Sequence, residues 1–390
     1  MKTIFVVLPT MKMFAGVFQL NSFNSLGGSG LIFILTSGES LSLALTELEG
    51  AMASTGMNSE IVDISPQVVL VRSNASENHW EEIAERTGHV IGIYRELFPS
   101  QLLTKKIERI IEERDDVHFD DILEILSTNS RFFCEWLASK SSLGLKSIRV
   151  QGAFQKVSGT TIKKAIGKLI TDGGGKLDLD LPQKVVTVII SRNIFIGEQI
   201  ALADRESMRK RRNQFRPFSL PITLSPNLSR VLMNMARVEK NQCILDPFCG
   251  TGGILLESAM IGARIYGSDI DIRMVEGTKE NFAFFNLGYQ HIEACDIEKA
   301  VDIFPVMDAV ITDPPYGRST STGGEKMENL YSRMFVSAEK ILKNGGRCAM
   351  ILPSMTYLSN LSEGLFLENA VSHRVHRSLI RHFISLKKKA

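Results

Sequence analysis

Along the second half of the chain, short apolar runs alternate regularly with longer segments of helical periodicity. The pattern predicts strands at 243–248, 264–270, 291–295, 307–312 and 347–352, and helices at 250–261, 273–287 and 327–342. Repeated strand–helix units build a parallel, doubly wound sheet. Ligands of such sheets bind at the carboxyl ends of the strands, so the residues that follow each strand are the candidates for chemistry.

In the first half, from about residue 31 to 197, strand-like and helix-like patterns alternate less regularly. Helices are predicted at 40–53, 80–88 and 159–171, and strands at 31–35, 61–71, 146–152 and 185–196, with further mixed elements at 120–125 and 129–139. This half indicates an α+β fold and contains no catalytic constellation. A Gly27-Gly28-Ser29-Gly30 cluster predicts a break, so residues 1–30 are expected to be a peripheral extension.

The length of 390 residues exceeds what one compact core needs, so two or three domains are expected. With 44% hydrophobic and 23% charged residues, the composition is typical of a soluble protein, and no apolar run approaches the roughly 18 residues of a membrane span. The five cysteines are scattered without a C-x-x-C pair, which predicts no metal site and a reducing, cytoplasmic location. A net charge of +2 means that any nucleic-acid affinity must come from local basic patches.

The first strand of the regular half runs into a glycine-rich turn, Asp246-Pro247-Phe248-Cys249-Gly250-Thr251-Gly252-Gly253. The dinucleotide fingerprint G-x-G-x-x-G would need glycine at position 255, where the sequence has leucine. The pattern D-x-x-x-G-x-G instead resembles motif I of the S-adenosylmethionine-dependent methyltransferases. The resemblance implies that the cofactor is contacted by Asp246, Phe248, Gly250, Thr251 and Gly252, with Asp246 near the cofactor ammonium group.

Acidic residues also follow the next two predicted strands. Asp269 lies 19 residues after Gly250, about the spacing at which an acid accepts hydrogen bonds from ribose hydroxyls, whereas Asp271 is expected to cap the following helix. Asp296 follows the third strand, where an acid of this family binds the adenine amine, although Asp296 alone suits a turn or cap equally well. Acids at three successive strand ends together predict one cofactor site.

The predicted strand at 307–312 leads directly into Asp313-Pro314-Pro315-Tyr316. Two prolines also suit a plain rigid turn, but the place at a strand end favours catalysis. An exocyclic base amine is a poor nucleophile, because its lone pair is delocalised into the ring. Asp313 and the Pro314 carbonyl can accept both amine hydrogens and direct that lone pair toward a methyl donor, while the prolines fix the carbonyl. Tyr316 can stack on a flipped base, and Asp313 can take the released proton.

The connection between the halves is basic. Six cations in twelve residues suit either a solvated surface or contacts with phosphates, and beside a base-modifying domain the second interpretation gains weight. The RNA-binding residues predicted in this segment are Arg209, Lys210, Arg211, Arg212 and Arg216. A second basic cluster runs from His373 to Lys389.

The tetrapeptide resembles the D/N/S-P-P-Y/F motif of enzymes that methylate exocyclic amines. With Phe215-Arg216-Pro217-Phe218, the segment 225–235 and the ending 373–379, the chain resembles the archaeal tRNA guanosine-10 N2-methyltransferases. The resemblance implies a Rossmann-like methyltransferase domain preceded by ferredoxin-like and THUMP RNA-binding domains. It also implies tRNA as the partner, one or two methyl groups on guanine N2, and, for some members, a small zinc-binding activator subunit.

On this resemblance the expected organisation is an extension at 1–30, a ferredoxin-like part at 31–75, a THUMP domain at 76–200, a basic linker at 201–228 and a methyltransferase domain at 229–390. A ribosomal-RNA guanine-N2 enzyme, a DNA adenine-N6 enzyme and a non-catalytic RNA-binding module remain as alternatives. No DNA substrate is expected, because the N-terminal half suits an RNA module. A vestigial fold would have lost residues such as Asp246, Asp269 and Asp313, which are all present.

Overall fold

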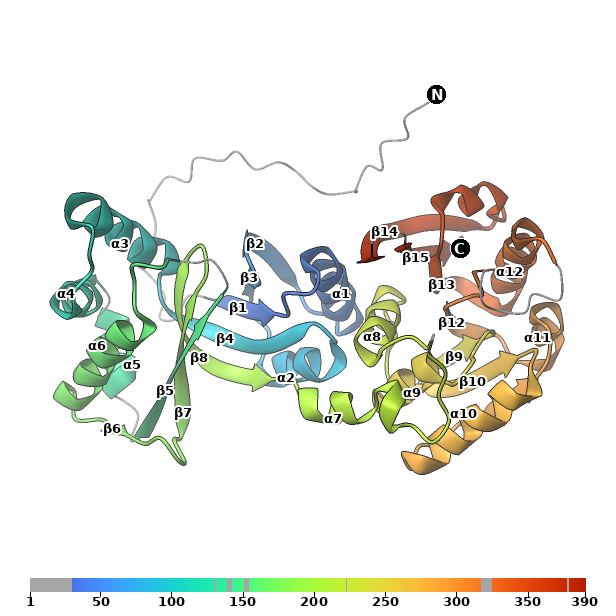
Figure 1. The fold of residues 1–390 in the computed structure, drawn as a ribbon, viewed down its shortest axis with the longest axis horizontal. Coiled ribbons are helices and arrows are strands. Elements are labelled where there is room, and N and C mark those ends of the chain that lie inside the picture. Colours follow the sequence, from blue (N-terminus) through green and yellow to red (C-terminus); the bar gives the residue numbers. More distant parts are fainter. Residues whose placement is uncertain are drawn as a thin grey trace, which may run out of the picture.

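The computed structural model describes residues 30–129, 131–138, 142–150, 154–221, 223–316, 325–376 and 379–390, and these form two α/β halves that lie side by side (Figure 1). The extension expected at 1–30 lies outside the described residues apart from Gly30. Within the described ranges, every helix is too short or too polar to cross a lipid bilayer.

The N-terminal half begins with a four-stranded unit whose strands follow the order β2-β3-β1-β4. Neighbouring strands are antiparallel, and side chains of both helices share a core with β1, β3 and β4. The elements of this unit are β1 (Leu31–Thr36), α1 (Leu41–Ser54), β2 (Ser59–Ser65), β3 (Val68–Ser73), α2 (Glu77–Arg86) and β4 (Val90–Phe98). This is a ferredoxin-like arrangement. The ferredoxin-like part expected at 31–75 contains β1, α1, β2 and β3, and α2 and β4 share their core.

A second α+β unit follows and extends the same sheet. Its strand β8 pairs with β4, so the full order of eight strands is β2-β3-β1-β4-β8-β7-β5-β6. Helices α3, α4, α5 and α6 share an apolar core with β5, β7 and β8. The elements are α3 (Ser100–Arg114), α4 (Phe119–Asn129), α5 (Arg131–Ala138), β5 (Ser142–Arg149), α6 (Gly159–Asp172), β6 (Lys176–Leu177), β7 (Lys184–Ile190) and β8 (Ile194–Leu202).

The C-terminal half is a Rossmann-like sheet with the order β11-β10-β9-β12-β13-β15-β14. The first five strands are parallel, as predicted, and β15 is antiparallel to β13 and β14. The strands are β9 (Cys243–Asp246), β10 (Arg264–Asp269), β11 (His291–Ala294), β12 (Met307–Thr312), β13 (Leu342–Leu352), β14 (Leu365–His376) and β15 (Leu379–Lys388). The helices are α9 (Gly253–Met260), α10 (Ile272–Phe284), α11 (Ile297–Ile303) and α12 (Met327–Ile341).

The segment expected to be a linker, 201–228, is built into both halves. Residues 201 and 202 end β8, and Asp204 caps α7 (Arg205–Lys210) by accepting a 2.9 Å hydrogen bond from the Ser207 amide. Beyond α7, the amide and carbonyl of Phe218 bond to the side chain of Asn281 on α10, at 3.1 and 2.7 Å. The segment therefore packs against the C-terminal half.

Helix α8 (Pro226–Met235) packs against α1, so it joins the two halves at the centre of the molecule (Figure 1). Gly50 of α1 allows this approach, because a Cβ atom there would lie 2.1 Å from the Asn234 carbonyl oxygen. The side-chain oxygen of Asn234 in turn accepts a 2.8 Å hydrogen bond from Nε of Arg86 on α2. The close helix contact and the buried polar pair fix the first half against the second.

Candidate functional site

The turn after β9 has a backbone that favours glycine at two positions. Gly250 and Gly252 have φ angles of +52° and +78°, in the left-handed region that side chains disfavour. A Cβ atom on Gly252 would also lie 2.7 Å from Cγ2 of Thr278, whereas the space beside Gly250 is open. The turn thus presents bare backbone at the start of α9, which suits close approach of a ligand.

Two of the three predicted cofactor acids organise this turn. Oδ1 of Asp246 accepts hydrogen bonds from the Thr312 hydroxyl at 2.7 Å and from the Phe248 amide at 3.1 Å. Oδ2 of Asp269 accepts from the Gly250 amide at 3.0 Å, and its Oδ1 accepts from the Asp271 amide at 3.0 Å. Asp271 caps α10, as expected. The structure therefore brings the ends of β9, β10 and β12 to one edge.

The electrostatics of this edge favour a cationic ligand. Asp246 is 1% exposed, and burial raises its pKa to about 7, with further upward contributions from Asp269 and Asp313. Burial also raises the pKa of Asp269. Carboxyl groups that repel one another in a buried cluster are stabilised in their charged form by a neighbouring cation. These carboxyl groups therefore fit the positively charged ammonium and sulfonium groups of the expected cofactor.

The remaining predicted cofactor residues occupy less direct positions. Asp296 caps α11 through the Glu298 amide and binds Arg333 of α12, with an Nη1–Oδ1 distance of 2.8 Å. Thr251 is buried, and its hydroxyl lies 3.0 Å from that of Thr223, so the two side chains link the segment before α8 to the turn. Phe248 is half-buried against the core of the sheet.

The tetrapeptide follows β12 at the same edge. Tyr316 donates its hydroxyl to Oδ1 of Asp313, within one turn of chain. Burial raises the pKa of Asp313 to about 6, even though the Tyr316 hydroxyl and the Arg381 guanidinium both lower it. Pro314 is buried and Pro315 is half-buried. Asp313 is thus a carboxyl group whose charge changes within one to two units of neutral pH.

Two side chains beside the tetrapeptide were not predicted from the sequence. Tyr331 of α12 donates its hydroxyl to the Pro315 carbonyl at 3.3 Å and stacks on Tyr357, with ring centroids 4.3 Å apart. Arg381 of β15 lies over the ring of Tyr316, with its guanidinium carbon 5.8 Å from the centroid. Tyr331 lies on the next helix and Arg381 on the last strand, outside the tetrapeptide motif, so the motif itself contains no signal for them.

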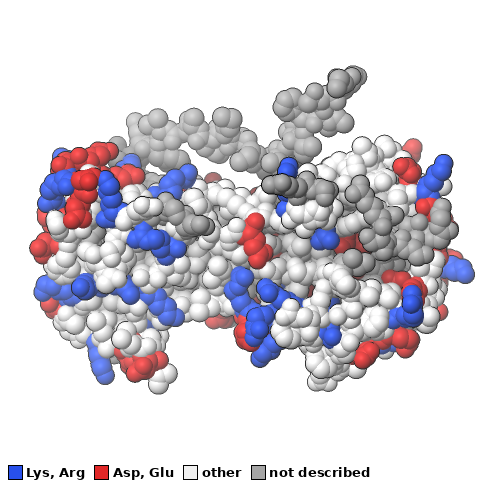
Figure 2. Space-filling model, viewed as in Figure 1, with Lys and Arg blue, Asp and Glu red and all other residues white. Residues whose placement is uncertain are grey.

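The basic segment divides into exposed and buried members. Arg209, Lys210 and Arg212 are exposed, and Figure 2 shows a group of basic side chains at the position of α7. Arg211 and Arg216 are 4% and 5% exposed, so they cannot make the phosphate contacts expected of them. Arg211 pairs with Glu257 of α9 at 2.7 and 2.9 Å, and Nε of Arg216 donates to the Arg211 carbonyl at 2.7 Å. The Arg211–Glu257 pair holds the segment to the second half.

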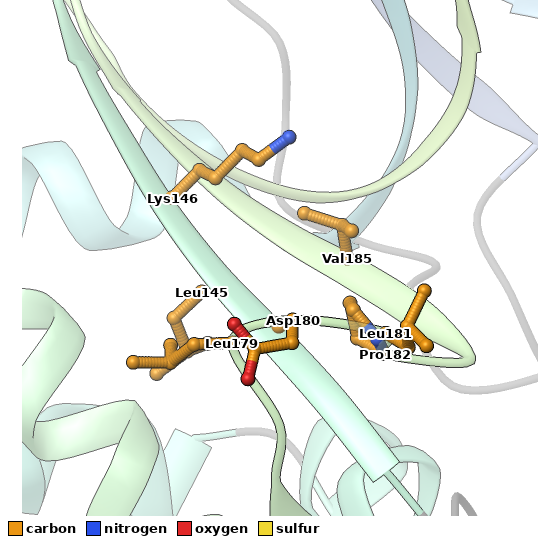
Figure 3. A pocket seen from close by; sticks show the side chains of 8 residues that line it. Leu145, Lys146, Leu179, Asp180, Leu181, Pro182 and Val185 are labelled. Atoms are coloured by element: carbon orange, nitrogen blue, oxygen red, sulfur yellow. The ribbon is translucent and has the colours of Figure 1, made fainter.

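A separate hollow lies on the N-terminal half, between β5, β7 and the loop that joins β6 to β7 (Figure 3). Its lining includes Leu179 and Leu181, which are 82% and 86% exposed, with one lysine and one aspartate. It contains none of the predicted site residues. Elsewhere in the described ranges, His, Cys, Asp and Glu form no group of three that could bind a metal ion.

Known proteins resemble the chain over nearly its whole length. Residues 213–382 match the family model described as "RMKL-like, methyltransferase domain". The tRNA (guanine(10)-N2)-dimethyltransferase of Methanothermobacter thermautotrophicus is 31% identical, over 90% of this chain and 97% of that protein. The enzyme of the same name from Methanocaldococcus jannaschii is 28% identical, over 92% and 100% of the two chains.

Among solved structures, TrmN from Thermus thermophilus shares the fold, with a TM-score of 0.50 and 19% identity over 92% of this chain and 99% of that one. Together with the intact turn and tetrapeptide, the sequence matches assign the chain to a family. The protein belongs to the tRNA (guanine(10)-N2)-dimethyltransferases.

Proposed function

We propose that this protein transfers methyl groups from S-adenosylmethionine to N2 of guanine 10 in tRNA, first one and then a second. The observation that carries the proposal is the Asp313–Tyr316 pair placed at the same sheet edge as Asp246 and Asp269. The names of the relatives supply the base, the atom and the nucleotide position.

In this proposal the cofactor occupies the turn after β9. Asp269 accepts hydrogen bonds from the ribose hydroxyls, and Asp246 faces the ammonium group. The absence of side chains at Gly250 and Gly252 allows the cofactor to approach the backbone closely. Asp296, held by Arg333, is the acceptor offered to the adenine amine. When bound, S-adenosylmethionine supplies an electrophilic methyl group on a sulfonium centre.

The tetrapeptide then binds and orients the guanine amine. The Tyr316 hydroxyl donates a hydrogen bond to Oδ1 of Asp313. Oδ2 is then left to accept one amine hydrogen, and the Pro314 carbonyl accepts the other. Tyr331 holds the neighbouring Pro315 carbonyl, so the turn stays in one conformation. Asp313 accepts the proton released on transfer. The two acceptors set the direction of the lone pair, and the proton leaves through the same carboxylate.

The N-terminal half and the exposed part of the basic segment are the proposed tRNA-binding surface. Arg209, Lys210 and Arg212 are exposed. The group of basic side chains at α7 lies between the halves, where a phosphate backbone crossing from the N-terminal sheet to the site would meet it (Figure 2). A THUMP domain at the second α+β unit, an activator subunit and a cytoplasmic location are further parts of the proposal that follow from the resemblance.

The rate of transfer should depend on pH through Asp313. Only the carboxylate accepts the amine hydrogen and the proton, so the rate at saturating cofactor and tRNA should rise with pH as Asp313 ionises. With a pKa of about 6, we expect about one tenth of the plateau rate at pH 5. Tyr316→Phe removes a hydrogen bond that stabilises the carboxylate, so the rise in rate should shift to higher pH. A rate that is constant from pH 5 to 8 would contradict the role of Asp313.

The proposal is tested with unmodified tRNA and labelled S-adenosylmethionine. Label should enter wild-type tRNA and be lost when guanosine 10 is replaced by adenosine. Duplex DNA and ribosomal RNA serve as the competing substrates. Label in either of these with none in tRNA would reject the proposed substrate, and equal labelling of the adenosine-10 tRNA would reject the position.

A further inference from the structure

Arg381 occupies a place beside the tetrapeptide that the proposed reaction does not explain. It lies on β15 with its guanidinium over the Tyr316 ring, and its charge lowers the pKa of Asp313 without any hydrogen bond between the two. Its Nε atom is buried and has no hydrogen-bond partner among the described residues. A buried guanidinium nitrogen without a partner is costly, so a ligand that supplies an acceptor is expected there.

Among the described residues no carboxylate forms a hydrogen bond with Arg381, although Asp313 is close enough for the guanidinium charge to lower its pKa. Across the hairpin its neighbour in register is His373, and burial, His89 and Arg381 itself lower the pKa of that histidine. Among the described residues, Arg381 forms no salt bridge with an aspartate or glutamate. The unpaired guanidinium is therefore available for acceptors on a bound substrate.

The spatial order of the groups fits the two ends of one base. The hydroxyl end of Tyr316 bonds to Asp313, whereas the Arg381 guanidinium lies over the ring of the same side chain. Guanine carries its N2 amine at one end and the O6 and N7 acceptors at the other, and arginine binds that pair bidentately. A base held by its amine on Asp313 extends its O6/N7 edge away from the carboxylate, toward a donor placed beyond it.

We propose that Arg381 reads the O6/N7 edge of the target guanine and so restricts the site to guanine. This inference rests on the proposed methylation of guanine N2. Arg381 is then a specificity residue that contacts the substrate base, whereas Asp313 and Pro314 bind the reacting amine.

The test compares two full-length tRNAs, one with guanosine and one with 2,6-diaminopurine riboside at the target position. The analogue keeps the 2-amine but replaces the O6 acceptor with an amine. Wild-type enzyme should prefer guanosine by about tenfold or more in kcat/KM, from the usual worth of a bidentate base contact. Both Arg381→Ala and Arg381→Lys should reduce this preference to within about twofold, since lysine keeps the charge but not the fork.

The matched control is Arg374→Ala, an exposed arginine on the partner strand β14, which should keep the wild-type preference. If Arg381 only binds a phosphate or supports the fold, its variants will lose activity equally on both tRNAs and keep the preference, which overturns the inference. The ratio is internal to each variant, so partial misfolding does not affect it. Failure of wild-type enzyme to form N2-methylguanosine would instead reject the proposed function.

Discussion

Replacing Asp313 with alanine should nearly abolish methyl transfer while the cofactor still binds. The variant loses the acceptor that orients the amine and the base that takes its proton, and a positioned base alone contributes about 10²- to 10⁴-fold. Asp246 and Asp269 keep their own hydrogen bonds to Thr312 and Gly250, so the turn after β9 should stay intact. Single-turnover rates with tRNA, beside calorimetric titration of S-adenosylmethionine, measure the two effects separately.

Tyr331→Phe is the matched control for this variant. It changes a neighbouring side chain that contacts the Pro315 carbonyl but no group assigned to the proton, so its rate should fall far less. If Asp313→Ala lost cofactor affinity as severely as activity, the residue would belong to the cofactor site. If it kept a rate near that of wild type, the tetrapeptide would not be the catalytic centre.

Replacing Glu257 with alanine should destabilise the protein more than any change at its surface. Glu257 is fully buried on α9 and pairs with both Arg211 and Arg230 at 2.7 Å. Burial alone would raise its pKa, but the two guanidinium groups outweigh that effect and lower it. Removing the carboxylate leaves two buried cations without their counter-ion, which typically costs about 3–5 kcal/mol. Urea unfolding followed by circular dichroism gives the free energy of unfolding.

Glu206→Ala is the control, because Glu206 makes the same kind of contact, to Arg209, on the exposed side of α7. Exposed pairs contribute little, so its unfolding curve should overlay that of wild type. A Glu257 variant as stable as the Glu206 variant would mean that residues 205–224 are not held by this buried pair.

The regular half of the fold could be predicted from the sequence, because buried parallel strands are short apolar runs. The sequence predicts its five parallel strands, with ends shifted by a few residues. The strand β4 was missed, since it carries Arg95 and Glu96 within its run, and Arg95 pairs with Glu77 and Glu198 rather than marking a loop. The hairpin β14–β15 is not predicted, because the cationic side chains around the buried Phe383 and Ile384 obscure the apolar pattern of a strand.

The candidate site was predictable where it is contiguous in sequence. The turn after β9, Asp269 and the tetrapeptide each follow a strand, so their meeting at one edge follows from the fold. The roles of Arg211 and Arg381 were not predictable, because each depends on a partner distant in the chain, Glu257 for one and Tyr316 for the other. A run of arginines in the sequence shows charge and does not show which guanidinium groups are buried.

The methylation of guanine N2 is best tested by nucleoside mass spectrometry of unmodified tRNA after incubation with the enzyme and S-adenosylmethionine. It identifies the base, the modified atom and the number of methyl groups in one measurement. We expect N2-methylguanosine at early times and N2,N2-dimethylguanosine later, both in the fragment that contains nucleotide 10. Methylated adenosine, or methylguanosine confined to another fragment, would contradict this expectation.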